Sequence, residues 1–63
     1  MCLSNVYQGD PADDCLLYRN IAELKTEGDE LVLTDIMGVR TRLRAVIRKI
    51  DLLENYIVVE PAS

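Results

Sequence analysis

Two cysteines and one methionine are the side chains of this sequence best suited to binding a soft metal ion. Cys2 follows Met1, Cys15 precedes an apolar run, and Met37 lies in a turn sequence. The chain has no histidine, which excludes Cys-His and Ser-His catalytic units and the usual near-neutral proton shuttle. Its 3 glycines are isolated and lack the spacing of a phosphate-binding loop. Binding is therefore favoured over catalysis.

Cys2 is the principal candidate ligand because of its position. When the second residue is small, Met1 is commonly removed, and Cys2 would then carry a free α-amine as well as its thiol. These two groups chelate a metal ion, and two such ends form a square-planar N₂S₂ set that suits Ni(II). One chain supplies only half of that set, so a second chain in a symmetric dimer would supply the rest. If Met1 is retained, Cys2 offers its thiolate and at most backbone amides.

Each of these three residues also has a structural interpretation. Cys2 is alternatively a small buried strand residue, as free cysteine often is. Cys15 adjoins Leu16 and Leu17 and is expected in or near the core, with a role as auxiliary ligand left open. An isolated methionine such as Met37 usually packs. Two cysteines do not make a disulfide framework, so reduced thiols are expected and a Cys2–Cys15 bridge is the alternative.

The composition predicts one folded domain over residues 1–63. A chain of 63 residues buries only about 60% of its unfolded surface, so a metal site or a dimer is a reasonable source of further stability. Hydrophobic residues make up 49%, which argues against disorder. No apolar run approaches the ~18 residues of a membrane span, and the first residues lack the pattern of a signal peptide. The expected compartment is the cytoplasm.

The chain predicts an all-β fold, a small antiparallel β-barrel of about six or seven short strands. Turn sequences recur roughly every 8–12 residues, and the clearest of them is Glu27-Gly28-Asp29-Glu30. Helix is the alternative over residues 17–24 and 39–50, where apolar residues are also spaced three and four apart. The predicted strands cover residues 2–7, 15–18, 21–27, 31–34, 39–44, 46–50 and 56–60.

Positive charge is concentrated in one segment although the net charge is −4. The segment 40–49 contains no acid and holds Arg40, Arg42, Arg44, Arg48 and Lys49. A small RNA-binding module could use such a row, but the net charge and the shortage of aromatic residues for base stacking oppose it. The other interpretations are pairing with acids such as Glu23, Glu27 and Glu30 on neighbouring strands, or docking to an acidic protein.

Taken in order, several segments of the chain resemble the CooT-like family of small nickel-binding proteins, accessory to maturation of nickel-containing carbon monoxide dehydrogenase. The resemblance implies a small β-barrel and a metallochaperone rather than an enzyme. It further implies a homodimer that shares one Ni(II) between the Cys2 residues of both subunits. Some members were earlier described as predicted RNA-binding proteins, which keeps that alternative open. The matching segments are residues 1–7, 27–29, 33–38, 50–53 and 56–60.

Overall fold

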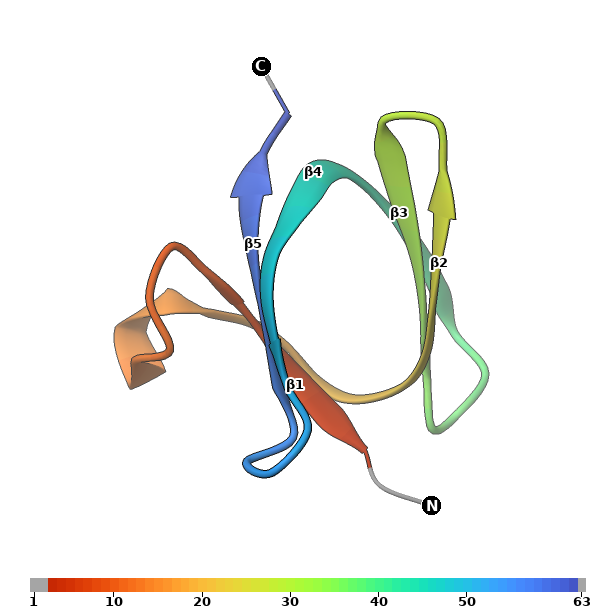
Figure 1. Ribbon diagram of the computed structural model, residues 1–63. Coiled ribbons are helices and arrows are strands. Elements are labelled where there is room, and N and C mark those ends of the chain that lie inside the picture. Colours follow the sequence, from red (N-terminus) through yellow and green to blue (C-terminus); the bar gives the residue numbers. More distant parts are fainter. Residues whose placement is uncertain (1–2, 63) are drawn as a thin grey trace.

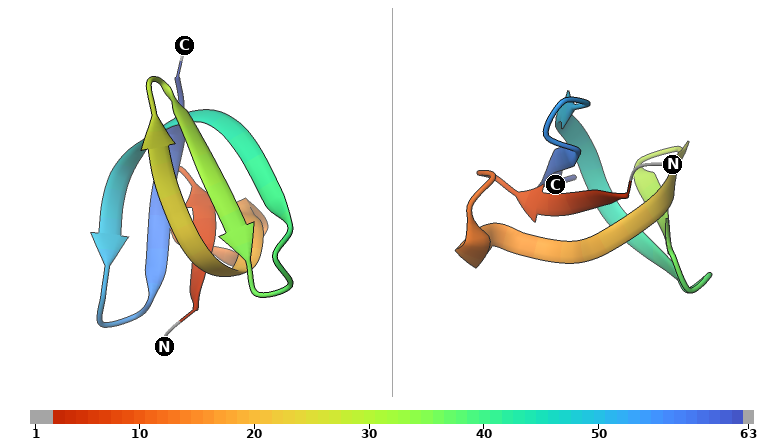
Figure 2. Two further views of the ribbon diagram at one scale, coloured as in Figure 1. Left: turned by 90° about the vertical axis from the view of Figure 1, so that its right-hand side faces the viewer. Right: turned by 90° about the horizontal axis from the view of Figure 1, so that it is seen from below.

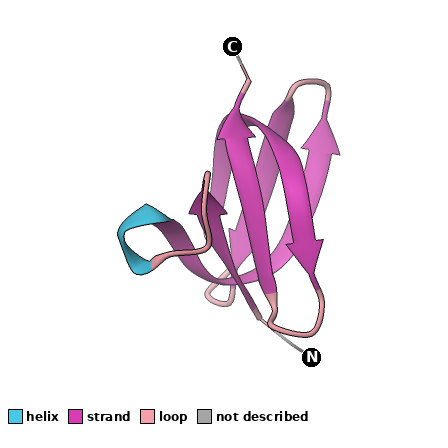
Figure 3. Cartoon of the chain, turned by 60° about the vertical axis from the view of Figure 1, so that its left-hand side comes forward, coloured by secondary structure: helices cyan, strands magenta, loops and turns pink. Residues whose placement is uncertain are grey.

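Segments of alternating apolar and polar residues form five strands that close into a barrel in the computed structural model (Figure 1). The structure describes residues 3–62. A short 3₁₀ helix, η1 (Asp13–Cys15), stands outside the barrel between the first two strands (Figure 3). Within the described residues the strands are β1 (Ser4–Gln8), β2 (Leu16–Glu27), β3 (Glu30–Asp35), β4 (Arg40–Asp51) and β5 (Tyr56–Pro61).

Neighbouring strands along the chain pair antiparallel, and the barrel closes where β1 pairs with β5. This last pairing is parallel, with Asn5 opposite Tyr56 and Gln8 opposite Val59. The parallel direction follows from the odd strand number, because the first and last of five alternating strands run the same way. The predicted all-β barrel is confirmed, with five strands in place of six or seven.

The lower strand number arises because β2 and β4 each continue through a predicted break. Each is 12 residues long and replaces two predicted strands. Both strands bend at a register shift, between Ile21 and Glu23 in β2 and between Ile47 and Lys49 in β4. Such irregularities let one strand curl around a small barrel without leaving the sheet. Figure 1 shows β4 arching over the barrel in this way. The helical alternative is wrong for both segments.

The barrel interior is filled by aliphatic side chains from every strand. Leu33 and Val6 are fully buried, and Ala45 occupies the middle of the arched β4. Tyr18, Leu24, Leu43 and Ile47 pack around this core. None of the helices in the described residues is long and apolar enough to cross a membrane. The core residues are Val6, Ile21, Leu31, Leu33, Ala45, Ile57 and Val59.

Two asparagines adopt left-handed backbone conformations where the chain bends. Asn20 has φ 58° within β2, and Asn55 has φ 59° just before β5. Asparagine tolerates this region better than other residues that carry a Cβ, apart from aspartate. Asn20 therefore supports the bend by which β2 passes from its pairing with β1 to its pairing with β3.

Replacing Leu33 with alanine should destabilise the barrel strongly. The side chain is fully buried, so Leu33→Ala leaves a cavity that costs about 2–5 kcal/mol of unfolding free energy. Urea denaturation followed by circular dichroism measures this loss. The matched variant Val46→Ala, at an exposed position, should lose less than about 1 kcal/mol. Equal losses at both positions would contradict the assigned core.

Position 20 should prefer glycine to alanine. An L-residue with an ordinary Cβ costs about 1–2 kcal/mol in the left-handed region, and glycine avoids this cost. Asn20→Ala should therefore be less stable than Asn20→Gly by about 1 kcal/mol. Thermal unfolding of the two variants under identical conditions gives the comparison. An Asn20→Ala protein as stable as Asn20→Gly would mean that β2 does not bend through this residue.

Candidate functional site

Cys2, the predicted metal ligand, lies outside the described residues. The strand that follows it begins at Ser4, two residues later. Ser4 is paired with Ile21 of β2, and Asn5 with Tyr56 of β5. The start of β1 is therefore the described part of the chain that is nearest to Cys2 in the sequence.

Two turns lie at the same end of the barrel as the start of β1. They are the β3–β4 turn (residues 36–39) and the β4–β5 turn (residues 52–55). Because β4 arches over the opposite end, both of its own ends come down to this one (Figures 1 and 2). We call this region, formed by the start of β1 and the two turns, the N-terminal end of the barrel.

Asn5 connects the parts of the N-terminal end. Its backbone N–H donates to the carbonyl oxygen of Asn55 in the β4–β5 turn at 3.2 Å. Its side-chain Oδ1 accepts a longer bond, 3.4 Å, from the backbone N–H of Asn20. The carbonyl of Asn20 in turn accepts from the N–H of Ile36 in the β3–β4 turn at 3.0 Å. A residue three positions after Cys2 is thus linked to both turns.

An aspartate holds each of the two turns. Asp35 Oδ1 accepts from the backbone N–H groups of Met37 at 2.9 Å and Val39 at 3.0 Å. Asp51 Oδ1 accepts in the same manner from Leu53 at 3.0 Å and from Glu54 at 2.8 Å. This local bonding is why aspartate is frequent at the start of turns. Both carboxylates are therefore engaged with the chain that immediately follows them.

Tyr56, the first residue of β5, lies beside β1. Its ring meets that of Tyr7 edge to face, with centroids 5.9 Å apart and planes at 86°. Lys49 Nζ donates to Tyr56 Oη at 2.9 Å and lies 5.4 Å from the ring centroid, so it approaches the ring at its hydroxyl edge. This hydrogen bond, together with a smaller contribution from Asp51, raises the pKa of Lys49 above its usual value. The ammonium remains protonated there.

Cys15 and Met37, the other two soft side chains, occupy different regions. Cys15 lies in η1, half-buried but outside the barrel, with Sγ 3.7 Å from Asp14 Oδ1. The next residue, Leu16, pairs with Tyr7 toward the far end of β1. Met37 is exposed at the N-terminal end, so its predicted packing role is wrong. Across residues 3–62, no three Cys, Asp or Glu side chains are grouped to hold a metal ion.

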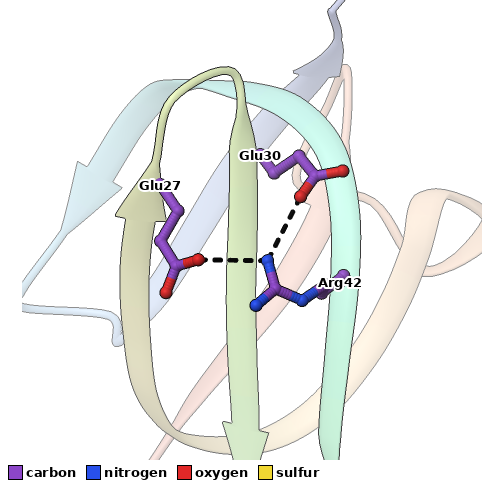
Figure 4. A network of polar contacts seen from close by, with 3 residues as sticks. All are labelled: Glu27, Glu30 and Arg42. Atoms are coloured by element: carbon purple, nitrogen blue, oxygen red, sulfur yellow. Dashed lines mark hydrogen bonds and ion pairs between the residues drawn. The ribbon is translucent and has the colours of Figure 1, made fainter.

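The basic segment 40–49 is largely paired with acids. Arg42 Nη1 lies 3.1 Å from Glu27 and 3.2 Å from Glu30 (Figure 4), and these contacts raise the pKa of its guanidinium. Arg44 lies 2.7 Å from Asp29, whose carboxyl pKa it lowers. The strand register brings the acids of this region close to the arginines, because Glu30 of β3 stands opposite Arg44 of β4. Pairing with Glu27 and Glu30, one of the three interpretations of the segment, is confirmed.

An open groove of about 400 Å³ borders the β3–β4 turn. Its apolar wall includes Leu17, Tyr18 and Val39, with Arg19 and Asp35 at the polar side. One carboxylate oxygen of Asp35 is already bonded to the backbone of the β3–β4 turn.

Comparison with known proteins identifies both the family and the fold. A family model described as "CO dehydrogenase accessory protein CooT" matches residues 1–60. A crystal structure of a protein from Carboxydothermus hydrogenoformans, provisionally described as CooT, superposes with a TM-score of 0.83 at 21% identity. The match covers 98% of this chain and 100% of that one, and it shows a shared fold. Comparison with curated protein sequences gave no match. By its family match, which spans Cys2 and all of the strands except the last residue of β5, the chain belongs to the CooT family of carbon monoxide dehydrogenase accessory proteins.

Proposed function

We propose that this protein binds Ni(II) as cargo and delivers it to a nickel-containing carbon monoxide dehydrogenase. The metal is held by the Cys2 thiolates of two chains in a homodimer. The observation that carries the proposal is the match to an accessory-protein family over a segment that includes Cys2, the residue with the strongest chemical claim to a metal. The role is carriage rather than catalysis.

The donor chemistry supports nickel as the cargo. Thiolate sulfur with nitrogen donors suits Ni(II) in a square-planar arrangement. Cys2 can provide its thiolate and an adjacent nitrogen, which is half of such a set. A second chain completes it in a symmetric assembly, where both chains contribute the same residue. Ligand exchange with a client enzyme then releases the ion without any redox change.

The barrel's part in this function is to fix the point from which Cys2 extends. Asn5 bonds to Asn55 and Asn20, and each aspartate-held turn is anchored to the same end. Cys2 is only three residues from Asn5. Ser4, where β1 begins, is two positions from Cys2, and two residues of extended chain span at most about 7 Å, which limits how far the ligand can be from the start of β1.

Replacing Cys2 should abolish nickel binding. Cys2→Ser removes the thiolate while keeping a small second residue, so the processing of Met1 is unchanged. We expect half an equivalent of Ni(II) per chain in the wild type and an affinity loss of more than about 100-fold in the variant, since even residues that only support a ligand contribute about 10–100-fold. Isothermal titration calorimetry and the thiolate-to-nickel absorption band report the binding.

Cys15→Ser is the matched control, because it removes the other thiol of the chain. It should retain the wild-type stoichiometry and absorption band. Unchanged nickel affinity in Cys2→Ser would contradict the proposal. Native mass spectrometry of the same samples gives chain processing, dimer mass and metal count together.

Nickel affinity should fall as the pH is lowered. A free thiol has a pKa of about 8.5, so at neutral pH binding must displace a proton, and affinity drops about tenfold per pH unit for each proton released. Two thiols would give a drop of up to about 100-fold per unit. Titrations in buffers between about pH 6 and pH 8 measure the slope. An affinity independent of pH over this range would argue against thiolate ligands.

A further inference from the structure

The outer face of β2, β3 and β4 carries a regular arrangement of charged side chains. Successive residues of a strand point to opposite faces of the sheet, and Leu31 and Leu33 of β3 lie in the core, so Val32 and Thr34 lie on the outer face. The strand register sets one residue of β2 and one residue of β4 beside each outward residue of β3. The three rows that result are Glu27–Glu30–Arg44, Lys25–Val32–Arg42 and Glu23–Thr34–Arg40.

A groove of about 380 Å³ lies on this face. In the second and third rows β3 contributes the short side chains of Val32 and Thr34, whereas β2 and β4 contribute long charged side chains that form two walls. Arg42 reaches across β3 to Glu27 (Figure 4), and Val32 in the same row is only 7% exposed although it lies on the outer face. The lining residues are Glu23, Lys25, Glu27, Val32, Arg40 and Arg42.

This groove keeps positive charge that no ion pair of the described residues neutralises. Arg42 is paired with Glu27. Lys25 and Arg40, on opposite walls, are both exposed and form no ion pair across residues 3–62. Together with Glu23, the lining side chains carry three positive and two negative charges, in a chain whose net charge is −4. An anionic group is therefore attracted to this groove although the protein as a whole repels it.

Thr34, which stands between Glu23 and Arg40 in its row, has a hydroxyl group without a partner. Its Oγ1 is buried and makes no hydrogen bond to any of the described residues. A buried hydroxyl in this state is unfavourable, because it has lost its hydrogen bonds to water. A carboxylate beside Arg40 could accept a hydrogen bond from Thr34 and bind the guanidinium through both of its oxygens.

We propose that this groove binds an extended acidic segment of a partner protein, with one carboxylate held by Arg40, Lys25 and Thr34. Both cations are exposed to water, so a small free carboxylate is held weakly. A segment that follows the groove makes several contacts at once and is retained. The lining residues include no thiol, so this inference goes beyond metal carriage and is independent of it.

An acidic peptide fits the groove better than RNA does. No aromatic side chain lines the groove, so a base has no ring on which to stack. Glu23 and Glu27 repel a continuous phosphate backbone. An extended peptide instead presents the carboxylates of alternate residues on one side, about 7 Å apart, and only these need to meet the two free cations.

The test measures binding of a fluorescein-labelled peptide of four Glu-Ser repeats to the full chain by fluorescence anisotropy at low salt. Arg40→Glu is compared with Arg48→Glu, which changes the net charge equally on the same strand but lies outside the groove. We expect Arg40→Glu to raise the dissociation constant by about tenfold or more and Arg48→Glu by less than about threefold. Thr34→Val, which keeps the net charge, should raise it by about threefold or more. Circular dichroism confirms that the variants fold.

The controls separate the groove from general charge effects. A peptide of four Lys-Ser repeats should bind more weakly to the groove than the acidic peptide. Equal losses in Arg40→Glu and Arg48→Glu would overturn the inference, because the peptide would then respond only to the overall charge. The same holds if the acidic peptide does not bind, or if Thr34→Val leaves its binding unchanged. Tighter binding of a labelled oligouridylate that is lost in Arg40→Glu would assign the groove to RNA and also overturn the inference.

Discussion

The parallel pairing of β1 with β5 is the contact on which the rest of this structure depends. It closes the sheet, so the described strands leave no long unpaired edge, and it covers one side of the buried Val6 and Val59. It also decides what surrounds the start of β1. Since Asn5 stands opposite Tyr56, the turn before β5 must lie beside the residues that follow Cys2. The same strand pairing thus closes the barrel and places the β4–β5 turn beside the start of β1.

The sequence predicted the parts of the fold that depend on neighbouring residues, and it did not predict the contacts between residues far apart in the chain. Gly28 and its neighbours predicted the β2–β3 hairpin, because a residue with φ of 62° strongly favours glycine. Alternating apolar residues predicted the strands themselves. The bend at Asn20 was interpreted as a break, because a turn and a bent strand have similar local sequences. The pairing of β1 with β5 joins residues about 50 positions apart, and no local pattern encodes it.

For the basic segment, too, the sequence shows which residues lie along one strand but not which residues of other strands they contact. Arg40, Arg42 and Arg44 alternate with half-buried residues along β4, so they share one exposed face of the strand. Whether their charge is free depends on the register between β3 and β4, which sets Glu30 opposite Arg44 and brings Glu27 and Glu30 to Arg42. These exposed pairs contribute little to stability, since solvent screens them. Their consequence is to reduce the free positive charge that an RNA would need, so the segment is better explained as a solvated, self-neutralised face.

The candidate site was identified through one residue, Cys2, whereas the structure describes the barrel formed by residues 3–62. Cys2 stood out from sequence because of its position and because of the family resemblance. The sequence did not indicate that the two aspartate-held turns lie near each other. From sequence alone, Asp35-Ile36-Met37 and Asp51-Leu52-Leu53 are two separate turns that happen to contain apolar residues. The fold brings these two similar turns to the end of the barrel where β1 begins.

Under the proposed arrangement, a cargo ion bound by two chains needs no donor from the barrel wall, and separation of the chains leaves each with half a ligand set. Association of the two chains then controls retention of the ion.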